Sequence, residues 1–217
     1  MATYEGFRLK INKLMRQINH DKWKSELFNN DFTIISNNCW GGMVYESYGM
    51  KKLSPTVGLY FMASDYVKFV YNIKNYINEP LVMISPEESK YKDNFMAPGS
   101  KRCPIGLLND IEIMFLHYKD NDDAIDKWNR RIDRINWDNL LFKFNDQNGC
   151  TEDDLKKFLE LDSHNKLFFT CKEWGVKDKS IIKVKQPFND DHIMASYEPF
   201  AHNRYLDVTK YLNEMIR

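Results

Sequence analysis

Apolar and polar residues follow two periods along this chain, and segments of the two kinds alternate from end to end. Short runs in which apolar residues dominate or recur at every second position predict β-strands, and longer segments with apolar residues every three or four positions predict amphipathic helices. The predicted strands are residues 32–36, 55–61, 81–84, 110–118, 140–144, 166–171 and 181–184. The predicted helices are residues 4–28, 43–48, 64–78, 122–136, a helix that opens at 151–154, and 204–216.

Strands that alternate with helices are typical of an α/β protein with a mostly parallel sheet. We therefore expect a three-layer α/β fold, with a mostly parallel or mixed sheet and helices on both faces. The sequence contains no internal repeat, low-complexity run or linker, so residues 1–217 should form a single domain. Segment 110–118 is the longest strand candidate and is apolar on both faces, which predicts a central strand covered on both sides. Residues 85–103 are polar, with two prolines and a glycine, and are predicted to form an excursion or lid loop.

The first helix, within residues 1–28, is amphipathic and basic. Its apolar residues recur at helical spacing and are expected to pack on the core of the domain, with arginines and lysines on the remaining surface. A basic amphipathic helix can also lie on a membrane surface or pack on a second subunit, so peripheral membrane association and a homo-oligomer stay open. The apolar residues are Phe7, Ile11, Leu14, Met15 and Ile18.

Two later helices have side chains suited to capping their first turns. Ser64 is expected to cap helix 64–78. Thr151 is expected to open the next helix in a capping box, with Asp154 in the place of the usual glutamate.

Amino-acid composition limits the binding partners and the cellular compartment that we expect for this protein. Lysine plus arginine (31) equal aspartate plus glutamate (31), so net charge gives no reason to expect nucleic acid as a partner. The four cysteines are far apart and lack metal-ligand spacing, which favours free thiols in a reducing cytoplasm over two disulfides. The N-terminus has no apolar signal region, and no run approaches the roughly 20 apolar residues of a membrane-spanning helix. A soluble cytoplasmic protein is expected.

The end of the first strand is the best candidate for a binding site. Residues 32–36 are followed by Asn37, Asn38, Cys39 and the pair Gly41–Gly42, after which a helix begins. In open α/β sheets the carboxyl ends of parallel strands border a crevice that holds ligands. Amide side chains can bind hydroxyl groups, and the N–H groups of a helix start attract phosphate or carboxylate. A tight strand-to-helix turn would need the same residue types, and both interpretations stay open.

Cys39 and His117 are candidate catalytic residues. A thiol at a helix N-terminus has a lowered pKa and can act as a nucleophile. His117 ends a different predicted strand, so the two side chains could form a Cys–His pair for acyl transfer. The alternative is that both are buried structural residues, since cysteine is one of the most frequently buried residue types.

Two further groups could contact an anionic ligand. Arg131 belongs to a helical stripe with Lys127, Arg130 and Arg134 that could clamp a pyrophosphate, or could simply be neutralised by neighbouring aspartates. Asp120 and Asp122 form a D-x-D sequence that could hold Mg²⁺ or Mn²⁺ on the diphosphate of a nucleotide sugar, although Asp122 is also a good helix cap. No metal site is therefore assigned. The chain contains neither G-x-G-x-x-G nor a P-loop motif, which argues against classical dinucleotide and P-loop chemistry.

Six motifs follow one another along the chain: Ile35–Gly42, Ser54–Leu59, Pro104–Gly106, Asp110–Ile113, Phe115–Tyr118 and Trp128–Ile132. Together they resemble a bacterial domain-of-unknown-function family that is often labelled exopolysaccharide or capsular polysaccharide biosynthesis protein. The resemblance covers nearly the whole chain and implies glycan assembly on the cytoplasmic side of a bacterium, but it carries no catalytic assignment.

Two functions follow from these observations. The first is a transferase that moves a glycosyl, acyl or phosphoryl group onto a sugar or glycan precursor, using a divalent metal with a nucleotide sugar, or an acyl donor. Its crevice would contain the residues that end the first strand, with Thr56, His117 and Arg131 nearby. The second is a non-catalytic glycan-binding or assembly protein of a polysaccharide synthesis complex.

Overall fold

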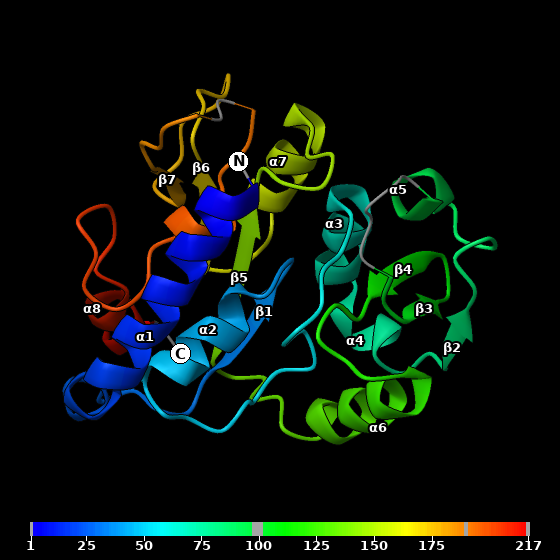
Figure 1. The fold of residues 1–217 in the computed structure, drawn as a ribbon, viewed down its shortest axis with the longest axis horizontal. Coiled ribbons are helices and arrows are strands. Elements are labelled where there is room, and N and C mark those ends of the chain that lie inside the picture. Colours follow the sequence, from blue (N-terminus) through cyan, green and yellow to red (C-terminus); the bar gives the residue numbers. More distant parts are fainter. Residues whose placement is uncertain (1, 97–101, 189–190, 216–217) are drawn as a thin grey trace.

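The structure is a computed structural model that describes residues 2–96, 102–188 and 191–215. Its centre is a parallel sheet in the order β1-β5-β6-β7 (Figure 1). The register places Ser36 beside Lys143 and Phe144 beside Phe168. The strands are β1 (Thr33–Ser36), β5 (Leu140–Asn145), β6 (Lys166–Thr170) and β7 (Ile181–Lys183).

Helices cover both faces of this sheet, as the three-layer prediction requires. Alternate residues of a strand point to opposite faces, so Ile35 and Phe144 pack on one side and Ile34 and Leu141 on the other. The first side is covered by α3 (Ala63–Tyr71) and α7 (Glu152–Leu159). The second is covered by α1 (Ala2–Glu26), α2 (Trp40–Ser47) and α8 (Val208–Asn213).

A small antiparallel sheet in the order β2-β3-β4 lies beside the parallel one, within the connection from β1 to β5 (Figure 1). Tyr66 and Phe69 of α3 belong to a hydrophobic cluster that includes residues of both sheets. The mixed α/β class is therefore confirmed, with the antiparallel strands in a sheet of their own. The elements of this part are α4 (Ile73–Tyr76), β2 (Leu81–Ile84), α5 (Lys92–Met96), β3 (Ile105–Leu108), β4 (Ile111–Met114) and α6 (Asn121–Ile132).

The prediction of one long central strand at 110–118 is wrong. Residues 105–114 form a β-hairpin, with the two-residue loop Asn109–Asp110 between β3 and β4. Asn109 has a φ of +56°, a left-handed conformation that asparagine tolerates better than most residues and that tight hairpin turns need. β4 lies at the edge of the antiparallel sheet. Its apolar faces are explained by the packing of α3 and α6 around this small sheet.

Three other element predictions need correction. Residues 55–61 are not a strand, because they form a turn with Gly58 at φ +82° and a single bridge from Tyr60 to Met114. The helix expected at 64–78 is divided at Asn72 into α3 and α4, and it begins at Ala63 with no side-chain cap from Ser64. The last helix is shorter than 204–216. The excursion at 85–103 contains α5, and its residues 97–101 lie outside the described part of the chain.

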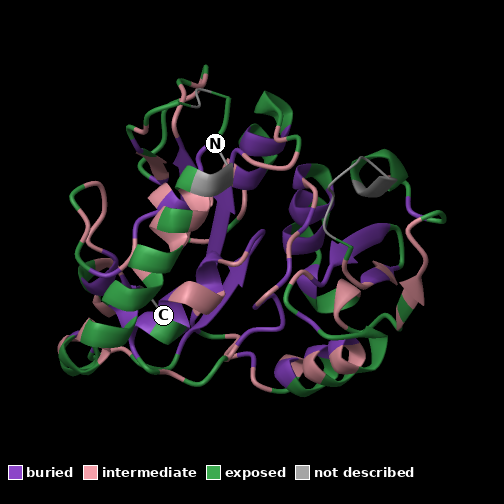
Figure 2. Ribbon diagram, in the orientation of Figure 1, coloured by how far each residue is buried: buried purple, intermediate pink, exposed green. Residues whose placement is uncertain are grey.

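The first helix is confirmed, but the expectation that its apolar residues pack on the core is wrong. Phe7 is 62% exposed and Ile18 is 68% exposed, and Ile11, Leu14 and Met15 are exposed with them. Figure 2 shows the exposed side of α1 facing the viewer. The helix is docked by its other side, where Trp23 is buried and Arg16 donates to Glu46 of α2 at 3.0 Å.

Candidate functional site

A cavity of about 620 Å³ lies where β1 and β5 end, on the side of the parallel sheet that faces the antiparallel part. We call it the strand-end cavity. Both strands run in the same direction, so their carboxyl ends meet at one edge of the sheet. The polar part of its lining consists of Asn38, Cys39, Asn94, Gln147, Asn148 and Gly149, and the apolar part includes Met43, Tyr60, Met62 and Leu116.

A network of buried polar side chains supports the wall of this cavity. Lys143, from the middle of β5, makes an ion pair with Glu198, and both side chains are fully buried. The Asn38 amide donates to Glu198 Oε2 at 3.1 Å, and its carbonyl oxygen accepts from Lys143 Nζ at 2.9 Å. The Asn145 amide donates to Glu198 Oε1 at 2.8 Å. Both members of the ion pair thus have further hydrogen-bond partners, which buried charges require.

The environment of Lys143 is unusual for a lysine. Its ammonium nitrogen lies 5.9 Å from the centre of the Trp40 ring and 5.4 Å from that of Phe169. Burial lowers the pKa of Lys143, and the carboxylate of Glu198 opposes that shift. The lysine and its partners fix the ends of β1 and β5 relative to each other.

Asn38 and Cys39 are the sequence-predicted residues that line the strand-end cavity. The Asn38 amide also donates to Gln147 Oε1 at 3.2 Å. Cys39 stands at the N-cap position of α2, with its thiol donating to Leu59 O at 3.8 Å. Asn37 is fully buried beneath them, and its amide donates to Asn145 Oδ1 at 2.7 Å. The predicted roles of these three residues stay predictions.

The predicted glycines and Thr56 support β1 from inside. Gly41 and Gly42 belong to the first turn of α2, where a Cβ would lie 3.1 Å from Ile34 and 2.9 Å from Val57, respectively. They let the helix approach its neighbours closely. Thr56 is buried and its hydroxyl accepts from the Ser36 backbone N–H at 3.0 Å.

His117 and Arg131 do not join Cys39 at the cavity. His117 is exposed, follows β4 and is not one of the lining residues. Arg131 is buried and donates to Val57 O at 3.0 Å and to the Tyr118 hydroxyl at 2.5 Å. The Cys39–His117 pairing and a ligand contact by Arg131 both stay predictions.

Asp120 and Asp122 take part in the start of α6. Asp120 is the N-cap, and its carboxylate accepts from the Asp123 N–H at 2.9 Å. The cap is thus Asp120 and not the predicted Asp122, which lies in the first turn. Within the described residues, no group of three or more histidine, cysteine or acidic side chains is placed to hold a metal ion. No disulfide joins the four cysteines, all of which lie in the described part of the chain.

Sequence reasoning did not identify Lys143, Gln147, Asn148 or Glu198 as parts of this region. The sequence does contain an indication for Lys143, because it is a lone cation between two phenylalanines in a strand with apolar neighbours. Gln147 and Asn148 were assigned only to a turn. Glu198 has no local signal, since it lies in an irregular segment 55 residues after its partner.

Comparison with known proteins agrees with the extent of this fold. Residues 10–215 match the DUF1919 family, which is described as a domain of unknown function. An uncharacterized protein of Haemophilus influenzae is 29% identical over 213 residues, which cover 98% of this chain and 97% of the relative. Both matches include every strand and the whole strand-end cavity.

Proposed function

We propose that this chain, which belongs to the DUF1919 family, acts in bacterial polysaccharide biosynthesis as a transferase on a sugar or glycan precursor. The precursor would bind in the strand-end cavity. The observation that carries this proposal is the lining of the cavity, which combines four amide side chains, an accessible thiol and an apolar wall.

The lining suits an uncharged ligand with many hydroxyl groups. Its four amides can donate and accept hydrogen bonds and so match the two roles of a hydroxyl; they belong to Asn38, Asn94, Gln147 and Asn148. Tyr60 and the methionines provide an apolar wall for the less polar face of a sugar ring. None of the described lining residues is a lysine, arginine, aspartate or glutamate. A neutral sugar therefore fits better than a free phosphate.

Cys39 supports group transfer at this position. It lines the cavity and precedes the first N–H groups of α2, whose dipole favours a thiolate. In acyl transfer the thiolate would attack the donor carbonyl, forming a thioester and releasing the donor's leaving group. A sugar hydroxyl would then take the acyl group and release the thiolate. Glycosyl and phosphoryl transfer remain alternatives that the same experiment separates.

The experiment measures binding and turnover with the same protein. Calorimetry with free monosaccharides tests binding, and incubation with acyl donors or nucleotide sugars tests transfer. Leu116→Trp should fill the cavity and weaken sugar binding at least tenfold. Leu14→Trp, on the exposed side of α1, is the matched control and should not change it. Absence of sugar binding in the unmodified protein would reject the proposal.

Three changes then distinguish the two mechanisms. Cys39→Ser should abolish acyl transfer and leave sugar affinity within about twofold. Chelation or Asp120→Ala should abolish transfer if a metal-bound nucleotide sugar is the donor. Turnover that survives all three changes would reject both mechanisms.

A non-catalytic glycan-binding or assembly role is the second candidate. It is favoured by the distribution of the titratable groups: His117 does not line the cavity, and Lys143 and Glu198 bind each other in the interior. Tight sugar binding without turnover of any donor, in a protein that requires the cavity for binding, would support this role over transfer.

We also propose that α1 associates with an anionic membrane surface. No described helix has the length and apolar character of a membrane span. The exposed stripe of Phe7, Ile11 and Ile18 instead suits a helix lying in the interface, and exposed Lys10 and Lys13 next to it suit anionic headgroups. Charge complementarity favours a membrane over a second copy of the chain, which would bring the same lysines to the contact.

Sedimentation with phosphatidylglycerol vesicles tests this association. Ile11→Asp with Ile18→Asp should abolish binding, whereas Val82→Asp, at an exposed apolar position on β2, should not. Phosphatidylcholine vesicles should bind at least tenfold less protein. A dimer that the double variant converts to a monomer would show that a second copy covers the stripe, and would overturn the proposal.

A further inference from the structure

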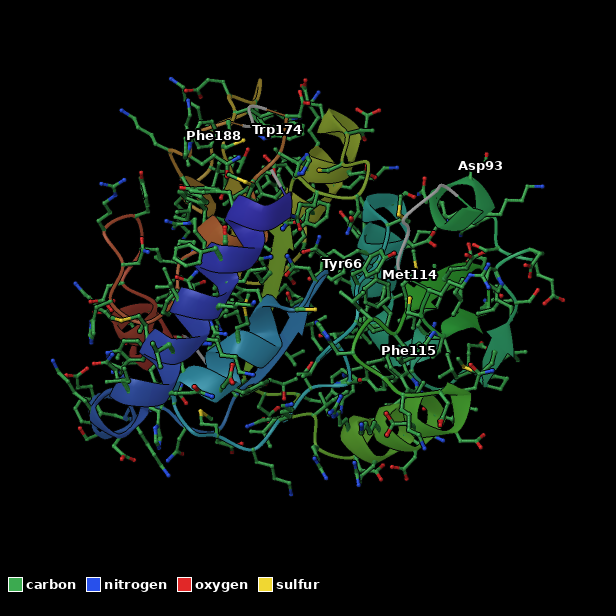
Figure 3. All side chains as sticks on the ribbon, in the orientation of Figure 1. Tyr66, Asp93, Met114, Phe115, Trp174 and Phe188 are labelled. Atoms are coloured by element: carbon green, nitrogen blue, oxygen red, sulfur yellow. The ribbon has the colours of Figure 1, made fainter. Side chains whose placement is uncertain are left out.

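A second cavity, of about 890 Å³, lies between α1 and the C-terminal segment 185–205. We call it the α1 cavity. Figure 1 shows that these two parts of the chain, far apart in sequence, run side by side. Figure 3 labels Phe188, which follows the lining residues Lys185–Pro187 and packs edge-to-face on Tyr4 of α1 at 5.4 Å.

The lining of the α1 cavity has an excess of positive charge. It contains Arg8 from α1, together with Lys185 and Arg204. Within the described residues, none of these three side chains lies at salt-bridge distance from a carboxylate. Among the described lining residues the one carboxylate is that of Glu198, which is already bound to the buried Lys143. The cavity is thus suited to an anion, unlike the strand-end cavity.

The lining also presents aromatic rings to a ligand. Tyr197, Phe200 and Trp23 line it, and the Arg8 guanidinium lies 3.8 Å from the centre of the Tyr197 ring. Stacking on a ring holds the guanidinium in one orientation while its N–H groups stay available. A flat ligand ring could pack on the remaining aromatic surface.

Two buried polar atoms in this lining lack a hydrogen-bond partner in the described part of the chain. They are Arg8 Nε and Ser196 Oγ, and the residue Ser196 is only 2% exposed. The two residues are neighbours, since Arg8 Nη2 donates to Ser196 O at 3.5 Å. Buried donors are almost always satisfied in folded proteins, so an unpaired arginine N–H and an unpaired hydroxyl on neighbouring residues indicate missing acceptors. The oxygens of a phosphate group are acceptors of the kind that both donors need.

We propose that the α1 cavity binds a nucleotide, with its phosphate on Arg8 and Ser196 and its base against the aromatic residues. This site is separate from the proposed sugar site. The 3-10 helix η1 (Ala195–Tyr197) forms the wall between them: Ala195 lines the strand-end cavity, and Ser196 and Tyr197 line the α1 cavity. The inference concerns binding alone and does not depend on transferase activity.

Calorimetric titration of the 217-residue chain with UDP, ADP and GDP tests the site. At least one nucleotide should bind, and inorganic phosphate should bind at least tenfold more weakly because it lacks the ring. Arg8→Gln should weaken nucleotide binding at least tenfold. Lys10→Gln, which removes an exposed charge of α1 outside the cavity lining, is the matched control and should change it less than twofold.

Ser196→Ala provides the sharper test. The Ser196 hydroxyl has no hydrogen-bond partner among the residues that the structure describes, so its removal should not lower the melting temperature. It should nevertheless weaken nucleotide binding several-fold. Unchanged nucleotide affinity in both Arg8→Gln and Ser196→Ala would overturn the proposal, as would the absence of binding across the panel.

Two further measurements distinguish the alternatives. Leu116→Trp blocks the strand-end cavity and should leave nucleotide affinity unchanged, so failure of the sugar proposal does not affect this one. Phosphatidylglycerol vesicles supply the same phosphate chemistry from a lipid. If Arg8→Gln and Ser196→Ala abolish vesicle binding while no nucleotide binds, the phosphate belongs to a lipid headgroup and the nucleotide assignment is wrong.

Discussion

Lys143 is a lysine held in the interior between aromatic rings, where its charge depends on one carboxylate. Removing an ion from water has a cost of several kcal/mol, and the attraction of Glu198 together with the amides of Asn38 and Asn145 offsets it. The arrangement connects β1, β5 and the segment that separates the two cavities. The Lys143–Glu198 pair therefore positions these segments relative to one another as well as contributing to stability.

Loss of one partner of this pair should be severe. Lys143→Met leaves the Glu198 carboxylate buried without its counter-ion, which should lower the free energy of unfolding by about 3–5 kcal/mol. The double variant Lys143→Met, Glu198→Gln removes both charges and should recover a large part of that loss. Urea unfolding of the single and double variants measures both effects. A single variant within about 1 kcal/mol of the unmodified protein would contradict this account.

Gly42 and Gly6 are both helical glycines, but their surroundings predict opposite effects of a methyl group. At Gly42 a Cβ would lie 2.9 Å from Val57 Cγ1, in a buried contact that leaves little room to adjust. Gly42→Ala should therefore lower stability by about 1–2 kcal/mol, despite the better helix propensity of alanine. At Gly6 an added Cβ would have nothing within 4 Å, so Gly6→Ala should raise stability by roughly 0.5–1 kcal/mol. Thermal unfolding of the two variants tests the contrast.

At the scale of elements, α1 is held to the C-terminal segment at its far end by His202. The imidazole bonds to the N-cap carboxylate of α8, Asp207, at 3.0 Å and to Glu26 of α1 at 2.6 Å. These hydrogen bonds raise the pKa of His202 above its ordinary value of 6.5. The folded protein therefore holds this proton more tightly than the unfolded chain does.

The raised pKa gives a stability difference with a defined sign. The contribution is fully present below the unfolded-state pKa and is lost as pH rises through the higher folded-state pKa. His202→Asn should thus destabilise the protein at about pH 5.5 and approach no effect near pH 9. Because His202 is nearly half exposed, the effect at low pH should be under about 1 kcal/mol. Urea unfolding of the unmodified protein and of the variant at the two pH values measures this difference.

The helices and strands show which features of the fold can be predicted from sequence patterns. Periodicity located the strands of the parallel sheet and the capping box of Thr151 and Asp154, because those signals are local. It missed the hairpin at Asn109–Asp110, where turn residues interrupt a run whose apolar residues continue on both sides. It also misassigned the docked side of α1. An apolar stripe does not reveal what it faces, and Arg16 and Trp23 determine the packing only through distant partners.

The residues of the candidate site likewise include some that local sequence can identify and others that it cannot. Asn38 and Cys39 could be placed at a strand end from local sequence alone, because parallel strands place their carboxyl ends at one edge. Lys143 and Glu198 meet only when β5 and the η1 segment are brought together. Both halves of the α1 cavity likewise come from opposite ends of the chain, so no local motif marks it.

At the scale of the whole molecule, the antiparallel part and the parallel sheet share one hydrophobic cluster. Phe144 of β5 lies 5.2 Å from Tyr66 of α3 and 5.4 Å from Phe168 of β6, measured between ring centres. Tyr66 stands between the two sheets in Figure 3. Phe69, one turn later on α3, continues the contact to Trp128 of α6 at 6.3 Å. Because aromatic packing is continuous across the two parts, their unfolding should be coupled.

Amide hydrogen exchange can measure that coupling. In the unmodified protein the most protected amides of β4 and β6 should exchange through the same global unfolding reaction. Phe144→Leu should lower stability by about 1–2 kcal/mol, because it removes ring contacts in the shared cluster. Since unfolding is common to both parts, protection in β4 and β6 should then fall by the same factor. If protection fell in β6 alone while β4 kept its own, the antiparallel part would unfold independently. The strand-end cavity, which has walls from both parts, would then open and close with the relative motion of two units rather than exist as a preformed site.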